Sequence, residues 1–101
     1  MITINITAEN IVKGIPHCNR NCPIALTFNE GKGVKGVAHA NIYDTHSTLF
    51  LKKKINGKTP TLDFLHSKEI KDFIERFDAG KKVSPKKISF NKKDIKRKRL
   101  L

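Results

Sequence analysis

The chain has 101 residues, the size of a single ordinary domain. No apolar run approaches the ~20 residues of a membrane-spanning helix, and two cysteines are too few for a secreted disulfide scaffold. The net charge is +12, of which residues 81–101 carry +9 through ten basic side chains and one aspartate. We therefore expect a one-domain protein of a reducing cytoplasm with a cationic C-terminal segment.

The N-terminal residues predict a strand followed by a short helix. The isoleucines of residues 2–6 alternate with polar residues, which is typical of a half-buried strand and unlike a signal peptide. Thr7 is expected to cap a helix over residues 8–13, and Gly14 to end it in a left-handed conformation. Two helical side chains are expected to face the core, Ile11 and Val12.

A second helix and a hairpin are expected next. Pro23 suits the first turn of a helix, where its missing N–H is not needed. Gly31-Lys32-Gly33 lacks the flanking strand and helix of a phosphate-binding loop and is interpreted as a linker. Strands are expected from Val37 to Tyr43 and over residues 48–52, joined as a hairpin through a turn.

Asn56-Gly57 indicates a tight turn, because both residues tolerate positive φ. It is expected to pair residues 53–55 with residues 58–61, with Pro60 restricting the returning strand to a sheet edge.

The C-terminal half predicts one clear amphipathic helix. Ser67 is expected to cap a helix over residues 68–77, which Gly80 ends. After Pro85, Ile88 and Phe90 alternate with polar residues in a last strand. Residues 92–101 are expected to be a flexible tail or a frayed helix.

This order of elements predicts the α+β class. We expect a small antiparallel-dominated sheet with two short N-terminal helices and one longer amphipathic helix packed on one face. The expected division is a single α+β domain over residues 1–91 and a basic C-terminal tail over residues 92–101.

Two motifs carry a resemblance to a known family. One is Cys22-Pro23-Ile24-Ala25-Leu26 at the start of the second helix, and the other is Phe77-Asp78-Ala79-Gly80-Lys81-Lys82-Val83-Ser84-Pro85, followed by Phe90. Together they resemble a family of small uncharacterised bacteriophage proteins with a Cys-Pro-Ile-Ala-Leu helix start and a Phe-Asp-x-Gly-x-x-Val-x-Pro closing motif. The resemblance covers most of residues 2–90 and implies a phage or prophage origin without implying an activity. This chain departs from the family in being more basic and in extending through residues 92–101.

Cys18 and Cys22, with His17 beside them, allow several interpretations. The favoured one is that both cysteines are small buried hydrophobic residues. As the residue before Pro23, Cys22 would lie at a helix N-cap, where the helix dipole favours a reactive thiolate. A disulfide and a zinc site are further alternatives, but His17, Cys18 and Cys22 are an incomplete tetrahedral set. No cofactor is expected.

No catalytic constellation is evident. The histidines are scattered, the carboxylates do not cluster, and there is no nucleophile motif or phosphate-binding loop. The sequence therefore predicts a protein that is not an enzyme.

The basic residues predict a nucleic-acid partner. Lysine-rich segments neutralise phosphates and give sequence-independent, salt-sensitive binding. The candidate nucleic-acid-binding residues lie around the predicted turn and in the tail: Lys52, Lys53, Lys54, Lys58, Lys92, Lys93, Lys96, Arg97, Lys98 and Arg99. For Lys52–Lys54 the favoured interpretation is a lysine-protected strand edge, whereas for the tail binding is favoured. Phe50 and Tyr43 are the aromatic residues near these cations.

We therefore expect a small phage-type protein that binds the DNA or RNA backbone non-specifically through its basic tail and lysine-rich turn. The alternative is a phage protein that binds an acidic or nucleic-acid-binding protein of the host or virion. A zinc- or redox-dependent module is the third hypothesis. No membrane partner is expected, and the expected location is the host cytoplasm, with the virion interior as the alternative. The sequence leaves the oligomeric state open.

Overall fold

The computed structural model describes residues 2–29 and 36–101, so the predicted Gly31-Lys32-Gly33 linker lies outside the described residues. Strands β1 (Ile2–Ile6) and β5 (Lys86–Phe90) form a two-stranded antiparallel ribbon. A separate sheet holds the other four described strands. The α+β class and the antiparallel pairing are confirmed, but the expectation of a single sheet is wrong. The ribbon and the larger sheet are separate layers that share one core.

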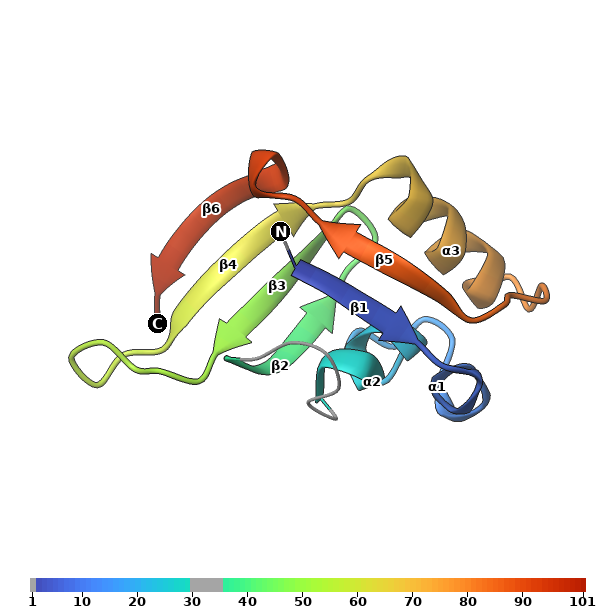
Figure 1. Ribbon diagram of the computed structural model, residues 1–101, viewed down its shortest axis with the longest axis horizontal. Coiled ribbons are helices and arrows are strands. Elements are labelled where there is room, and N and C mark those ends of the chain that lie inside the picture. Colours follow the sequence, from blue (N-terminus) through green and yellow to red (C-terminus); the bar gives the residue numbers. More distant parts are fainter. Residues whose placement is uncertain (1, 30–35) are drawn as a thin grey trace.

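The four-stranded sheet is antiparallel throughout, with the strand order β2-β3-β4-β6. Its strands are β2 (Val37–Ile42), β3 (His46–Leu51), β4 (Pro60–Leu65) and β6 (Ile95–Leu100). The predicted hairpin of β2 and β3 is confirmed, with Ala40 opposite Leu49. The β1–β5 ribbon crosses this sheet at an angle (Figure 1).

Both sheets and the helices contribute to one hydrophobic core. The ring of Phe90 from β5 lies 5.5 Å from that of Phe28 in helix α2 (Pro23–Asn29) and 5.6 Å from that of Phe64 in β4. Ile4 of β1 and Ile70 of helix α3 (Lys68–Asp78) are also fully buried. Because such aromatic pairs join elements distant in the chain, the core fixes the ribbon against the larger sheet.

Helix α1 (Ala8–Lys13) has the predicted bounds, and Thr7 caps it. The prediction that Val12 faces the core is wrong, because its side chain is 84% exposed, and Ile11 is half-buried. The fully buried residue of α1 is Asn10, whose side chain completes a capping box with Thr7. Capping and hydrogen bonding thus place a polar side chain in the buried position of this short helix.

Gly14 is required for close packing rather than for a left-handed conformation. Its φ is −64°, so the predicted left-handed helix end is wrong. A Cβ atom at this position would lie 2.6 Å from the ring carbons of Pro23. Pro23 is the first residue of α2 (Pro23–Asn29), as predicted.

The turn at Asn56 and Gly57 is confirmed by their φ angles of +51° and +75°. The predicted strand pairing around it is wrong, because only the bridge between Ile55 and Lys58 forms there. The following strand is β4, which lies between β3 and β6 rather than at an edge. Pro60 is tolerated in this interior strand because it is the first residue.

Helix α3 (Lys68–Asp78) begins at the predicted cap, Ser67, whose hydroxyl accepts a hydrogen bond from the Ile70 amide. Phe73 is buried, and Gly80 beyond the helix has a φ of +76°. None of the helices in the described ranges is long and apolar enough to cross a membrane.

The prediction of a flexible tail or a frayed helix over residues 92–101 is wrong. A short 3-10 helix (Lys92–Asp94) leads into β6, which pairs with β4 (Figure 1). The backbones of Leu101 and Thr59 exchange hydrogen bonds of 2.8 and 2.9 Å. Ile95 packs against the core, and the strand hydrogen-bonds the free edge of β4, which explains why a highly charged segment is ordered here.

Candidate nucleic-acid interface

Side-chain alternation gives the four-stranded sheet two different faces. One face buries Leu49, Phe64 and their neighbours in the core. We call the opposite face the open face. It carries His39, Asn41, His46, Thr48, Phe50, Thr61, Asp63, Leu65, Arg97 and Arg99, and Tyr43 continues it beyond β2. These residues combine aromatic rings, amides, hydroxyls and cations, so the open face has a chemistry unlike that of the core face.

Two ring stacks lie on the open face. The rings of His39 and Phe50 have centroids 4.3 Å apart and planes 12° apart. Tyr43 and His46 form a second stacked pair at 4.8 Å. His39 is exposed and Phe50 is half-buried, so solvent reaches part of the first pair, although each ring covers one face of the other.

Asp63 organises the cationic part of the open face. Its carboxylate is 1% exposed and accepts a 2.7 Å hydrogen bond from the Thr48 hydroxyl. The Nε of Arg97 donates to Oδ2 at 3.1 Å, and an Nη of Arg99 donates to Oδ1 at 3.2 Å. These bonds connect β3, β4 and β6, so a single carboxylate fixes the guanidinium groups of the edge strand.

The surroundings of Asp63 keep it charged. Burial alone would raise the pKa of its carboxyl, but the hydrogen bonds from Thr48 and Arg97 and the charge of Arg99 outweigh burial and lower the pKa. Two guanidinium groups therefore share one negative charge, and the cluster keeps an excess positive charge. Arg97 is 57% exposed, and its terminal nitrogens make no hydrogen bond to any residue in the described ranges.

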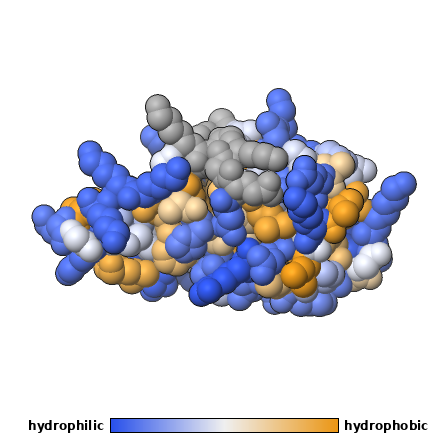
Figure 2. Space-filling model, turned by 90° about the horizontal axis from the view of Figure 1, so that it is seen from below, coloured by the Kyte–Doolittle hydropathy of each residue, from blue (hydrophilic) through white to orange (hydrophobic). Residues whose placement is uncertain are grey.

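The structure brings some of the predicted binding residues together and separates others. Lys52–Lys54 and Lys58 lie in the loop between β3 and β4, at the end of the sheet where β6 ends at Leu100, next to Arg99 (Figure 1). At that end of the molecule, most side chains in view are hydrophilic (Figure 2). Lys92 and Lys93 lie at the opposite end of β6, about 20 Å away by strand geometry.

The basic residues of β6 and of the short helix before it lie on different sides of the sheet. Arg97 and Arg99 lie on the open face, opposite Asp63 and Thr61 respectively. Lys92 and Lys98 instead line a hollow of about 290 Å³ with core-side residues that include Leu62. Their hydrocarbon stems can cover apolar surface there while the ammonium groups reach solvent.

The cysteine segment forms no assembled site. Both thiols are free, and Cys22 is buried whereas Cys18 is half-buried. Burial raises the pKa of Cys22 to about 11, which disfavours the alternative of an activated thiolate at the N-cap. A hydrogen bond from the Arg20 backbone lowers the pKa of Cys18. Among the described residues, no three His, Cys, Asp or Glu side chains are placed to hold a metal ion.

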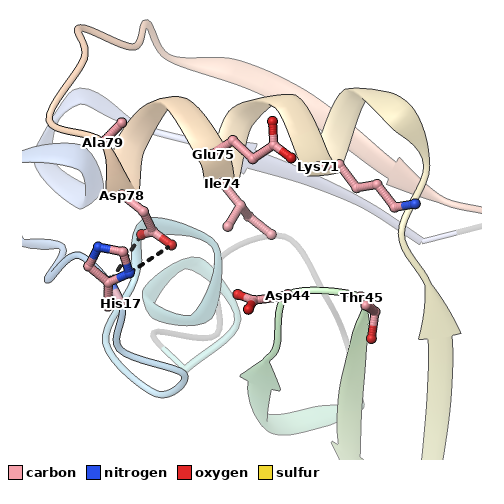
Figure 3. Close-up of a pocket in the computed structure, with 8 residues that line it drawn as sticks. All are labelled: His17, Asp44, Thr45, Lys71, Ile74, Glu75, Asp78 and Ala79. Atoms are coloured by element: carbon pink, nitrogen blue, oxygen red, sulfur yellow. Dashed lines mark hydrogen bonds and ion pairs between the residues drawn. The ribbon is translucent and has the colours of Figure 1, made fainter.

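His17 is occupied elsewhere. Its backbone N–H donates to Asp78 Oδ1 at 3.0 Å, and its Nδ1 lies 3.7 Å from Asp78 Oδ2. Figure 3 shows these two side chains meeting at a groove of about 660 Å³ that Asp44, Glu75 and Asp78 line with His17 and Lys71. With three carboxylates, this groove is unsuited to phosphate.

A Ser–His pair that the sequence did not reveal lies beneath the surface. The hydroxyl of Ser47 is 2.6 Å from Nε2 of His66, whose Nδ1 is 3.3 Å from the backbone oxygen of Asp44. Ser47 is fully buried and His66 is 7% exposed. Because a substrate cannot reach Ser47, this pair joins β3 to the end of β4 rather than forming a nucleophile.

Sequence analysis also missed Asp63 and the role of the two arginines. A signal existed, because Asp63 lies between apolar Leu62 and Phe64, and arginine alternates with lysine through β6. That period of two is typical of a strand with two different faces.

Comparison with models of protein families, with curated proteins and with solved structures gave no match for this chain. The bacteriophage resemblance therefore stays a prediction from the motifs alone.

Proposed function

We propose that this protein is a non-enzymatic nucleic-acid-binding protein. It would hold the phosphate backbone through the basic edge of the sheet, formed by β6 and the loop Lys52–Lys58. The phage origin and the host-cytoplasm location belong to the same proposal and rest on the sequence alone.

One observation supports this proposal above the others. The backbone hydrogen bonds between Thr59 and Leu101 place the end of β6 beside the lysine-rich loop. Two basic segments more than thirty residues apart in the chain thereby share one end of the sheet. Clustered cations of this kind release counterions from a nucleic acid and give affinity with little sequence preference.

A charge-matched pair of variants tests the proposal. The loop variant is K52Q/K53Q/K54Q/K58Q, and the control is K68Q/K71Q/K81Q/K82Q around α3. Both remove four positive charges from exposed positions. If the loop contacts phosphate, only the loop variant should lose affinity strongly, and its slope of log K against log[salt] should fall by about 3.

Equal effects of the two variants would contradict this basic-edge mechanism. Failure of the wild-type protein to bind DNA or RNA at low salt would contradict nucleic-acid binding itself. In that case a partner captured from nuclease-treated host extract would favour the alternative function, binding to a host or virion protein.

A further inference from the structure

We infer that the open face binds single-stranded nucleic acid, with bases stacking at the His39–Phe50 pair and phosphates at Arg97 and Arg99. This inference rests on the proposed function and adds a substrate class to it. A basic edge alone would serve single and double strands alike. The additional information lies in the rings and in their placement relative to the arginines.

The strand register sets the rings and cations in rows across the sheet. His39 is opposite Phe50, Phe50 is opposite Thr61, and Thr61 is opposite Arg99. Adjacent strands are ~4.8 Å apart, which places Arg99 about 10 Å from Phe50 along the row. The next row ends at Arg97. An aromatic surface is therefore flanked on one side by a pair of guanidinium groups.

Rings beside cations suit an unpaired strand. Bases of a single strand can stack on aromatic side chains, which tolerates any base because each has a π-face. The bases of a duplex are stacked on one another, so a protein ring has no equivalent contact to make with them. The His39–Phe50 pair therefore favours single strands in a way that lysines cannot.

Asp63 prepares the phosphate contacts. It binds Nε of Arg97 and one terminal nitrogen of Arg99, which limits the freedom of both side chains before a ligand arrives. Arg97 keeps its terminal nitrogens available for a planar, bidentate contact with phosphate oxygens. The positive charge of the lysine-rich loop lies at the same end of the sheet as the Phe50 row.

Unsatisfied polar atoms point to the same face. The buried side-chain polar atoms that lack a hydrogen bond within the described part of the chain are Asn41 Oδ1, Thr61 Oγ1 and Arg99 Nε. All three belong to open-face residues. Buried polar atoms are normally satisfied, so their concentration here supports a face that gains hydrogen bonds when a ligand rearranges the side chains above it.

The test measures binding of fluorescein-labelled single-stranded DNA of about ten thymidines, the matching RNA, and a DNA duplex of equal length, by anisotropy. The variants are Phe50→Leu, which keeps an apolar side chain, and His39→Ala at an exposed position. Phe77→Leu on α3 is the control, because Phe77 is also half-buried but lies away from the open face. Circular dichroism at the binding temperature checks that each variant is folded.

The inference predicts tighter binding to single strands than to the duplex at equal salt. Phe50→Leu and His39→Ala should weaken single-strand binding by about tenfold or more, with duplex binding and the Phe77→Leu variant little changed. If Phe50→Leu is unfolded, the affinity of His39→Ala alone tests the inference. The inference would be overturned if single strands and duplex bind equally and neither substitution changes the affinity. In that case, a loss of affinity in K52Q/K53Q/K54Q/K58Q would still uphold the proposed function. No binding to any of these probes would contradict both.

Discussion

Asp63 connects sequence, stability and function at a single residue. A carboxylate removed from water costs free energy unless it is paired and hydrogen-bonded. Here Thr48, Arg97 and Arg99 supply the partners, and the arginines come from the edge strand. The same contacts that make the buried charge tolerable also hold two cations on an exposed face.

Asp63→Asn should destabilise the fold by about 1–3 kcal/mol, because two charge-assisted hydrogen bonds lose their acceptor charge. The figure is at the low end for a buried ion pair because Arg97 is 57% exposed and can be hydrated. Urea unfolding measures the change. Asp72→Asn on the exposed side of α3 is the control, and an equal loss in both variants would show that Asp63 has no special role.

His66 predicts a specific pH dependence of stability. Burial lowers its pKa from 6.5 to about 4, so the unfolded chain binds the proton more readily than the fold. The free energy of unfolding should therefore fall as the pH drops from 6.5 to 4, by up to about 3 kcal/mol. The lowered pKa of Asp63 removes its contribution at still lower pH, below its ordinary value of 3.8.

The measurement is chemical unfolding at several pH values, with His66→Gln as the comparison. The variant should lose the part of the slope between pH 6.5 and 4, whatever its stability at pH 7.5. An unchanged slope in His66→Gln would mean that other groups cause the acid sensitivity.

The prediction for Gly14 concerns packing rather than backbone conformation, because its φ of −64° suits any residue. Gly14→Ala should cost about 1–3 kcal/mol, because its Cβ would lie 2.6 Å from the Pro23 ring. The double variant Gly14→Ala/Pro23→Ala should recover part of this loss, as unfolding in a double-mutant cycle would show. If the losses of stability of the two single variants simply add up in the double variant, the clash with Pro23 is not the cause.

Among the elements, those with local signals were predictable. Thr7, Ser67 and Pro23 mark helix starts that the structure confirms, and Asn56-Gly57 marks a turn. Each depends on hydrogen bonds or φ preferences within a few residues of chain. Strand β6 was missed, and the strand at Pro60 was expected at a sheet edge, because the pairing of β4 with β6 joins residues more than thirty positions apart. Composition alone could not show that a lysine- and arginine-rich segment would complete a sheet.

The pairing of β6 with β4 has a direct consequence for amide exchange. Thr59 and Leu101 exchange both backbone hydrogen bonds, so alternation makes the amides of Arg99 and Arg97 bonded and that of Lys98 outward-facing. Hydrogen exchange followed by NMR should find the two arginine amides protected and the Lys98 amide fast. Fast exchange at all three amides would mean that this segment is a flexible tail and not a paired strand.

At the scale of the whole molecule, charge is divided between two surfaces. The basic edge lies along β6 and the loop Lys52–Lys58, while the groove beside α3 is lined by Asp44, Glu75 and Asp78. The net charge of +12 therefore understates how strongly one surface should attract a polyanion. A polyanion approaching this protein should be steered to the basic edge and away from the groove.

The candidate site was predictable only in part, because some of its features depend on composition and others on the pairing of strands. Sequence identified the cations and named Phe50 and Tyr43 as the nearby rings, because these are properties of composition. It could not assign Arg97 and Arg99 to one face or place Asp63 beneath them, since both require the register of three strands. The open face is thus a property of the fold.

The most direct test of this account is an NMR titration of the isotopically labelled protein with a thymidine single strand. We predict that shift changes concentrate at His39, Phe50, Thr61, Arg97 and Arg99, and in the loop Lys52–Lys58. Changes confined to the groove at His17, Asp44 and Glu75, or an unchanged spectrum at low salt, would contradict it.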